Sequence, residues 1–243
     1  MAPPGVHIRA TRLAAGARPP ETLREEVARL EDDLPHAALR LAEADPAVLV
    51  YGCAASSFAG AGDAWITDAI QRVLDRPVVT VARAACDGLC HLGVTRVGVG
   101  TPYPRDVNDD LVGYLTDAGL RVVAVESIPY EKGTDPNAAF DLGSRLGRRR
   151  VEGLFFCCTD LATAQALDPL ERSLGKPVVS ANQAGLWACL GRLGLAGRVA
   201  GYGSLLAATQ PWSPRGKTRT ARSRRSPGGA GNTACGGPRR VAS

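Results

Sequence analysis

The chain has 243 residues, 45% of them hydrophobic, and a formal net charge of +5. This length is enough for one large α/β domain or two small ones, each with a buried core. No apolar run reaches the roughly 20 residues of a membrane helix, and the N-terminus lacks the apolar stretch of a secretory signal. We therefore expect a cytoplasmic protein with no membrane partner.

The positive charge is concentrated at one end of the chain. Residues 211–243 contain eight Lys or Arg side chains and no acid, so the remainder carries a net charge of −3. A segment rich in Gly, Pro, Ser and Arg buries too little apolar surface to fold. We predict a disordered basic tail over 207–243 and expect no nucleic-acid partner, since only this tail supports that alternative.

Short apolar runs alternate with stretches of helical periodicity along the rest of the chain. A first helix is predicted over 20–43, with Pro35 breaking it in two. The other predicted helices cover 63–74, a stretch that ends at Leu92, then 106–118, 134–146, 163–174 and 183–193. The predicted strands are 47–51, 77–81, 97–100, 121–125, 151–156 and 177–180. This alternation is typical of βαβ units with parallel strands.

The sequence also repeats itself. Val48–Cys53 and Glu152–Cys158 are apolar runs that end in cysteine, and a helix and a Pro-Val-Val strand follow each of them. The fold class is therefore α/β, with two similar parallel-sheet halves related by a pseudo-twofold axis and a cleft between them. The predicted parts are a first half over 1–95 completed by 178–206, a second half over 96–177, and the tail.

Each half presents one cysteine, Cys53 or Cys158, at the carboxyl end of a strand, where open α/β sheets form their ligand crevices. A helix that begins beside a thiol lowers its pKa through the helix dipole and backbone N–H donors. Two thiols on opposite sides of a substrate can serve as one acid and one base, or as a nucleophile and an acid. The repeat therefore predicts a two-cysteine active site.

The other cysteines have simpler interpretations. Those inside predicted helices, and the one that precedes Cys158 on its strand, are expected to be buried in the core. They are Cys86, Cys90, Cys157 and Cys189, while Cys235 falls in the tail. Neither the cysteines nor the three histidines have zinc-site spacing, so no metal is expected. No strand is followed by a Gly-rich phosphate loop, so no nucleotide or other cofactor is expected.

Four ordered motifs carry a resemblance to a known family. They are Val50-Tyr-Gly-Cys-Ala-Ala-Ser-Ser-Phe58, Thr101-Pro-Tyr-Pro-Arg-Asp-Val-Asn108, Cys158-Thr-Asp-Leu161 and Leu170-Glu-Arg-Ser-Leu-Gly-Lys-Pro-Val-Val-Ser-Ala-Asn-Gln-Ala184. Together they resemble the aspartate/glutamate racemase superfamily, and most closely its branch of maleate cis-trans isomerases and arylmalonate decarboxylases. The resemblance covers about 4–206.

The resemblance implies a role for each thiol. In isomerase-like members, a thiolate at the Cys53 position adds to the substrate double bond, and the thiol at Cys158 handles a proton. Racemase-like members exchange a proton beside a carboxylate, and decarboxylases carry glycine at the first position, so Cys53 argues against that activity. Tyr103 matches a carboxylate-binding tyrosine, and the backbone around Thr159 and Asp160 would supply further donors.

The sequence departs from the family pattern at three places, one of which is the additional basic tail after the segment that ends at Leu206. Ala54 and Ala55 stand where the family carries hydroxyl side chains that hold a carboxylate, and we expect Ser56 or Ser57 to replace them. Asn182 is a further candidate for contact with the substrate. The family's first strand precedes the region matched here, so its apparent absence is expected to leave a sheet edge and one wall of the pocket open.

These observations favour a cofactor-independent two-cysteine isomerase of a small dicarboxylate, with maleate the favoured substrate. An aspartate/glutamate-type racemase and an arylmalonate-type decarboxylase are the alternative enzymes. An inactive, carboxylate-binding family member is the alternative from another class. A homo-oligomer stays open.

Overall fold

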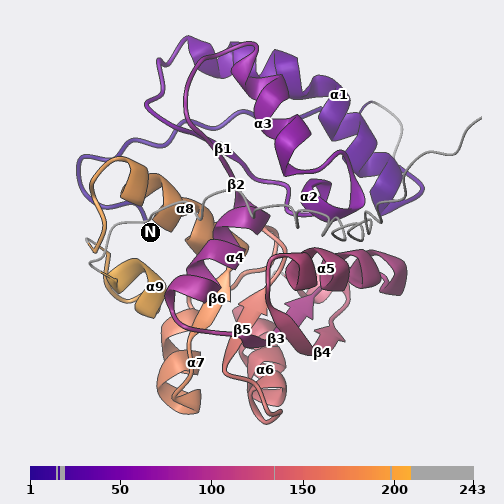
Figure 1. Ribbon diagram of the computed structural model, residues 1–243, viewed down its shortest axis with the longest axis vertical. Coiled ribbons are helices and arrows are strands. Elements are labelled where there is room, and N and C mark those ends of the chain that lie inside the picture. Colours follow the sequence, from indigo (N-terminus) through magenta and orange to yellow (C-terminus); the bar gives the residue numbers. More distant parts are fainter. Residues whose placement is uncertain (15, 17–19, 134, 198, 209–243) are drawn as a thin grey trace, which may run out of the picture.

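The computed structural model describes residues 1–14, 16, 20–133, 135–197 and 199–208, in which helices and strands alternate as expected (Figure 1). The helices are α1 (Leu23–Ala42), α2 (Ser56–Ala59), α3 (Asp63–Gln71), α4 (Val81–His91), α5 (Arg105–Asp117), α6 (Pro136–Gly147), α7 (Leu167–Leu174), α8 (Ala181–Arg192) and α9 (Ser204–Ala207), with a 3₁₀ turn η1 (Tyr130–Lys132). The strands are β1 (Leu49–Tyr51), β2 (Val78–Thr80), β3 (Arg96–Thr101), β4 (Arg121–Ser127), β5 (Gly153–Phe156) and β6 (Val178–Ser180).

The strands form two parallel sheets, which confirms the predicted α/β class. One sheet contains β1 and β2, and the other has the order β4-β3-β5-β6. Leu49 pairs with Val78 in the first sheet, and Leu154 pairs with Val178 in the second. These pairs occupy equivalent places in the sequence repeat, so the repeat corresponds to two equivalent pairs of parallel strands.

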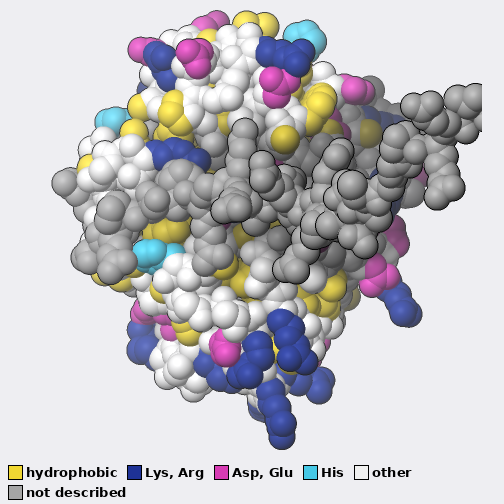
Figure 2. All heavy atoms as spheres, viewed as in Figure 1, with side chains coloured by type: hydrophobic (Ala, Val, Ile, Leu, Met, Phe, Trp, Pro, Cys, Tyr) yellow, Lys and Arg dark blue, Asp and Glu magenta, His cyan; other side chains and the backbone are white. Residues whose placement is uncertain are grey.

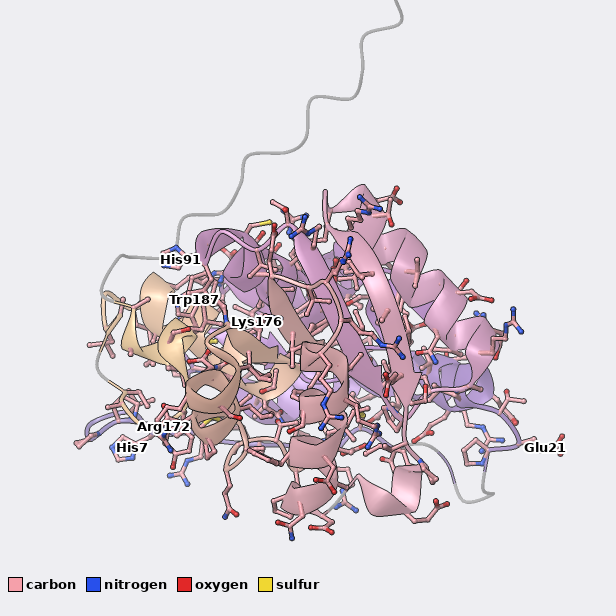
Figure 3. The ribbon with its side chains drawn as sticks, turned by 90° about the horizontal axis from the view of Figure 1, so that it is seen from below. His7, Glu21, His91, Arg172, Lys176 and Trp187 are labelled. Carbon is pink, nitrogen blue, oxygen red and sulfur yellow. The ribbon has the colours of Figure 1, made fainter. Side chains whose placement is uncertain are left out.

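Helices α4 and α8, which follow the two equivalent strands β2 and β6, pack against each other near the middle of the molecule (Figure 1). A Cβ on Gly185 would lie 2.9 Å from Val81 Cγ1, so glycine permits the close approach of these helices. At the outer end of the same contact, the rings of His91 and Trp187 lie 5.3 Å apart between centroids (Figure 3). The contact joins the helices of the two repeats.

Residues 178–206, predicted to complete the first half, contain β6 and α8. β6 pairs with β5, with Phe156 opposite Ser180. A short parallel crossover through α7 places consecutive strands side by side, and that local connection decides the sheet to which β6 belongs. Both β6 and α8 contact the first half: β6 through α4, and α8 through α4, β1 and β2. The division at residues 95 and 96 stays a prediction.

Helix α1 runs without a break through Pro35, so the predicted interruption is wrong. Proline removes one backbone hydrogen bond and costs a helix interior about 3 kcal/mol. The helix buries one face that includes Val27 and Leu34, and burial of each such side chain contributes about 1.5–3 kcal/mol. Thr22 also caps the first turn, accepting a hydrogen bond from Glu25 N at 3.1 Å. Packing of this face therefore outweighs the cost of the proline.

The sequence predicted an open sheet edge in the first half and a disordered basic tail over 207–243. Within the described residues, β1 has β2 as its one hydrogen-bonded neighbour, and Val50 is 43% exposed, as expected for an open edge. Residues 209–243 of the predicted tail lie outside the described residues, and α9 extends to Ala207. No helix in the described part of the chain is long and apolar enough to span a membrane.

Candidate active site

Cys53 lies just after β1, two residues beyond Tyr51 and directly before the short helix α2. Its side chain is partly exposed. The backbone N–H groups of Ala55 and Ser56 and the Ser56 hydroxyl lie near enough to its thiol to lower the pKa, although burial raises it more. The Ser56 hydroxyl also forms a 2.8 Å hydrogen bond with the Tyr51 hydroxyl. The turn between β1 and α2 thus surrounds this thiol with donors.

Cys158 occupies the equivalent place after β5 and is 5% exposed. The backbone N–H of Asp160 and the Tyr103 hydroxyl lie near enough to its thiol to lower the pKa, although burial raises it more. Tyr103 follows the end of β3 and is itself 7% exposed. Its ring lies 5.9 Å from the ring of Phe58 in α2, measured between centroids. Tyr103 therefore contacts both the second thiol and the helix that follows the first one.

Cys53 and Cys158 both lie near Tyr103. Burial is the main cause that raises the pKa of the Tyr103 hydroxyl, and the charges of Cys157, Cys158 and Cys53 raise it further. The charge of Cys53 also contributes to the raised pKa of Cys158. Two thiols and one phenol, from the ends of β1, β5 and β3, therefore lie within electrostatic reach of one another.

A direct hydrogen bond joins the two strand ends that carry the thiols. Thr159 Oγ1 donates to Gly52 O at 2.8 Å, although the two residues are 107 positions apart in the chain. Asn182 Nδ2 in α8 donates to Thr159 O at 2.7 Å. Both residues are therefore at the predicted site, with these polar atoms engaged by protein partners.

The remaining candidates differ in burial and in their partners. Ser56 and Ser57 are buried; the Ser56 hydroxyl has a hydrogen-bond partner, whereas Ser57 Oγ has none within the described residues. Asp160 is exposed, and its carboxylate accepts a hydrogen bond from the Tyr130 hydroxyl of η1. Ser57 Oγ is thus a buried hydroxyl without a protein partner in the described residues, and the Asp160 carboxylate is engaged by Tyr130.

The pKa of each thiol is shifted in the direction opposite to the one expected. Burial raises the pKa of Cys53 above its usual value and raises that of Cys158 to about 11, although N–H donors lower both. The expected helix dipoles are weak here because α2 has only four residues and α7 begins at Leu167, well after Cys158. Both cysteines are therefore protonated near neutral pH.

Three aromatic residues of the site were missed by the sequence prediction. Tyr51 lies two residues before Cys53, and alternation along a strand places such residues on the same face. This two-residue spacing could therefore have predicted that Tyr51 lies beside Cys53. Phe58 and Tyr130 reach the site only through tertiary packing of α2 and η1, for which the sequence gives no periodic signal.

Three of the other cysteines are buried as predicted, whereas Cys90 is more exposed than predicted for a core residue. Cys86, Cys157 and Cys189 are buried, at 2%, 0% and 7% exposure, and Cys90 is partly exposed. Cys235 lies outside the described residues. No group of three or more His, Cys, Asp or Glu side chains in the described ranges is arranged to hold a metal ion.

Comparisons with known proteins agree with this arrangement. The family described as arylmalonate decarboxylase matches residues 4–206. The arylmalonate decarboxylase of Bordetella bronchiseptica is 31% identical over 212 residues, which cover 83% of this chain and 87% of that protein. The maleate isomerase of Nocardia farcinica is 29% identical over 209 residues, covering 81% of this chain and 82% of that protein.

A solved structure gives the same relationship. The crystal structure of a maleate isomerase from Pseudomonas putida S16 is similar with a TM-score of 0.70 and 28% identity, covering 78% of this chain and 82% of that one. A cysteine-to-serine mutant of the Nocardia farcinica isomerase, with a covalently bound succinylcysteine intermediate, also superposes with a TM-score of 0.70. It is 26% identical and covers 75% of this chain and 80% of that one.

Proposed function

The chain belongs to the arylmalonate decarboxylase family, and we propose that it is a cofactor-independent isomerase that converts maleate, or a close dicarboxylate, from cis to trans. The observation that carries the proposal is the pair of thiols, Cys53 and Cys158, at equivalent strand ends around Tyr103. Maleate isomerases are among its relatives. A thiol at the first position also distinguishes this chain from the decarboxylase pattern, in which glycine stands there.

We assign Cys53 as the nucleophile because it is the more exposed thiol and lies beside donors from Ala55 and Ser56. The reactive form is the thiolate, reached by loss of the Cys53 proton to solvent. Its sulfur bonds to one alkene carbon, and the π electrons move to the neighbouring carbon and its carboxylate. The succinylcysteine intermediate seen in the Nocardia isomerase is the kind of adduct that this step forms.

Cys158 then completes the cycle as an acid and a base. It donates its proton to the carbanion carbon, which leaves a single C–C bond about which the adduct rotates. The Cys158 thiolate next removes a proton from that carbon, the double bond forms again, and the C–S bond breaks to release fumarate and the Cys53 thiolate. Each proton, bond and electron pair is restored, so no cofactor is needed.

The substrate carboxylates need donors on both sides of the site. Tyr103 and the backbone N–H groups near Thr159 and Asp160 are proposed to bind one carboxylate. The Ser57 hydroxyl, buried and without a protein partner in the described residues, is proposed to bind the other. Both thiols must stay reduced for this chemistry, so we place the protein in a reducing compartment such as the cytoplasm.

One observation favours a second candidate, decarboxylation of an arylmalonate. The residues that follow Cys53 are Ala54 and Ala55, which are 2% and 1% exposed and supply no hydroxyl side chains. An apolar wall on this side suits an aryl substituent better than a second carboxylate. The 31% identity with the Bordetella decarboxylase points the same way.

Proton NMR of the purified chain in deuterated buffer separates these activities. We expect fumarate from maleate and no product from phenylmalonate. Cys53→Ala and Cys158→Ala should each lower turnover at least 100-fold, because general acid–base and nucleophilic groups contribute about 10²–10⁴-fold or more. The matched controls Cys86→Ala and Cys189→Ala alter buried thiols outside the site and should keep turnover within about threefold. Release of phenylacetate would instead identify a decarboxylase. Absence of product from both maleate and phenylmalonate would contradict an enzymatic role.

A further inference from the structure

We propose that Thr159 is a positioning residue. Its hydroxyl forms a hydrogen bond between the two halves and thereby sets the distance between Cys53 and Cys158. The inference rests on the two-thiol function proposed above. Gly52, which accepts the bond, directly precedes Cys53, and Thr159, which donates it, directly follows Cys158. Each end of the 2.8 Å contact is therefore one residue away from a thiol.

Side-chain packing also joins the strand ends, because Phe58 of α2 lies 5.9 Å from Tyr103 between ring centroids and α2 contacts α5, but no ladder of backbone hydrogen bonds does so in the described residues. β1 pairs only with β2, and no hydrogen-bonded strand joins that sheet to the four-stranded sheet. The main helix contact between the repeats, α4 against α8, includes the start of α4, where Val81 faces Gly185. A Cβ built on Gly52 would have no neighbouring heavy atom within 4 Å, so close packing around its Cα does not restrict this residue. The hydrogen bond from Thr159 to the Gly52 carbonyl does restrict it.

Thr159 is itself held from the other side. Asn182 Nδ2 donates to Thr159 O at 2.7 Å. Asn182 lies in the first turn of α8, where Ser180 and Gln183 form a capping box that fixes the start of the helix. A continuous series of hydrogen bonds thus runs from α8 through Thr159 to the end of β1. Because its hydroxyl hydrogen is given to Gly52, the Thr159 side chain positions the site rather than donating to the substrate.

Loss of this hydroxyl should affect the reaction step more than binding. Addition at one carbon and proton transfer at its neighbour require both sulfurs at set distances, and a displacement of about 1 Å can cost about 100-fold in rate. We expect Thr159→Val, which keeps the shape but removes the donor, to lower kcat about 10- to 100-fold with KM within about threefold. Thr159→Ser keeps the donor and should retain kcat within about threefold.

The separation of the thiols can be measured without turnover. The full chain carrying Cys90→Ala and Cys235→Ala is treated with dibromobimane, which links two nearby thiols, and the Cys53–Cys158 cross-link is quantified by peptide mass spectrometry. We expect equal rates in the parent and Thr159→Ser, and a rate at least fivefold lower in Thr159→Val. The rates of single alkylation by iodoacetamide should stay unchanged. Asn182→Ala should lower the cross-linking rate in the same direction, and serves as the second variant if Thr159→Val folds poorly.

The outcomes separate this proposal from the proposed function. If Thr159→Val loses turnover but cross-links at the parent rate, Thr159 contacts the substrate and the positioning role is wrong. If Thr159→Val keeps both, the hydrogen bond does not matter. If the parent chain turns over no substrate but shows the Thr159-dependent cross-link, the positioning role of Thr159 is supported and only the isomerase function is refuted. If the parent chain forms no cross-link, the proposed positioning of the two thiols by Thr159 is wrong.

Discussion

At the residue scale, the site combines donors that favour thiolates with burial that opposes them. Cys53 and Cys158 each receive at least one backbone N–H, yet the pKa of each is raised because burial penalises the charged form. A substrate that carries two carboxylates does not remove this penalty. The ionisation of Cys53 is therefore expected to limit the rate at neutral pH.

The first prediction follows from the direction of these shifts. Because the thiolate is the reactive form and the Cys53 pKa is raised, kcat/KM for maleate should rise about tenfold per pH unit below that pKa. The increase should end as pH approaches the Cys158 pKa of about 11, since Cys158 must act as an acid. A pH–rate profile checks this, with enzyme stability measured at each pH. A flat profile from pH 6 to 8 would show that the thiolate is already formed.

A second prediction concerns the isolated hydroxyl of Ser57. A buried hydroxyl without a partner costs about 1–3 kcal/mol, so Ser57→Ala should keep or raise the free energy of unfolding. If Ser57 binds a substrate carboxylate, the same change should raise KM about tenfold, because a charge-assisted hydrogen bond is lost. Thermal unfolding and steady-state kinetics on one preparation measure both effects. A loss of stability without a change in KM would mean that Ser57 has a structural role.

The two thiols were predictable because the repeat places both at the same point of the same local pattern. Phe58 and Tyr130 were not, since their positions depend on how α2 and η1 pack on distant elements. The direction of the thiol pKa shifts was also missed, because it depends on burial and on helix length. Both quantities are properties of the folded structure and not of the motif.

At the element scale, α1 shows how tertiary packing overrides a local signal. Its apolar face is buried on both sides of Pro35, with Val27 before the proline and Ala38 after it. The sequence contained both signals, the periodicity and the proline, but not their relative energies.

A third prediction tests this account of α1. Pro35→Ala restores a backbone donor and removes the ring from the helix, a gain of up to about 3 kcal/mol. The greater freedom of the unfolded chain offsets about 1 kcal/mol of this. We expect the free energy of unfolding to rise by about 1–2 kcal/mol with unchanged kcat, as measured by urea denaturation and activity assays. A less stable variant would show that the proline fits this position.

At the scale of the whole molecule, the candidate site contains residues that follow β1, β3 and β5, which belong to two sheets, whereas a group of basic side chains lies elsewhere. Lys and Arg side chains gather on the lower part of the molecule, over α6 (Figure 2). Arg145 and Arg149 of this region pair with Glu126, at 3.2 and 3.6 Å. These arginines belong to the second half and pair with a carboxylate of the same half. The thiol site, in contrast, draws on both halves.

A site shared by both sheets predicts that ligand binding stabilises the entire molecule. Ligand at 100 times its Kd adds about 2.7 kcal/mol to the free energy of unfolding, which for a chain of this size corresponds to roughly 5–10 °C in Tm. We expect maleate or fumarate to produce this shift in a single cooperative transition. Tyr103→Phe, which removes one proposed carboxylate donor, should reduce the shift at the same ligand concentration. Two transitions, of which only one moves with ligand, would mean that the site lies within one half and that Thr159 does not couple the two.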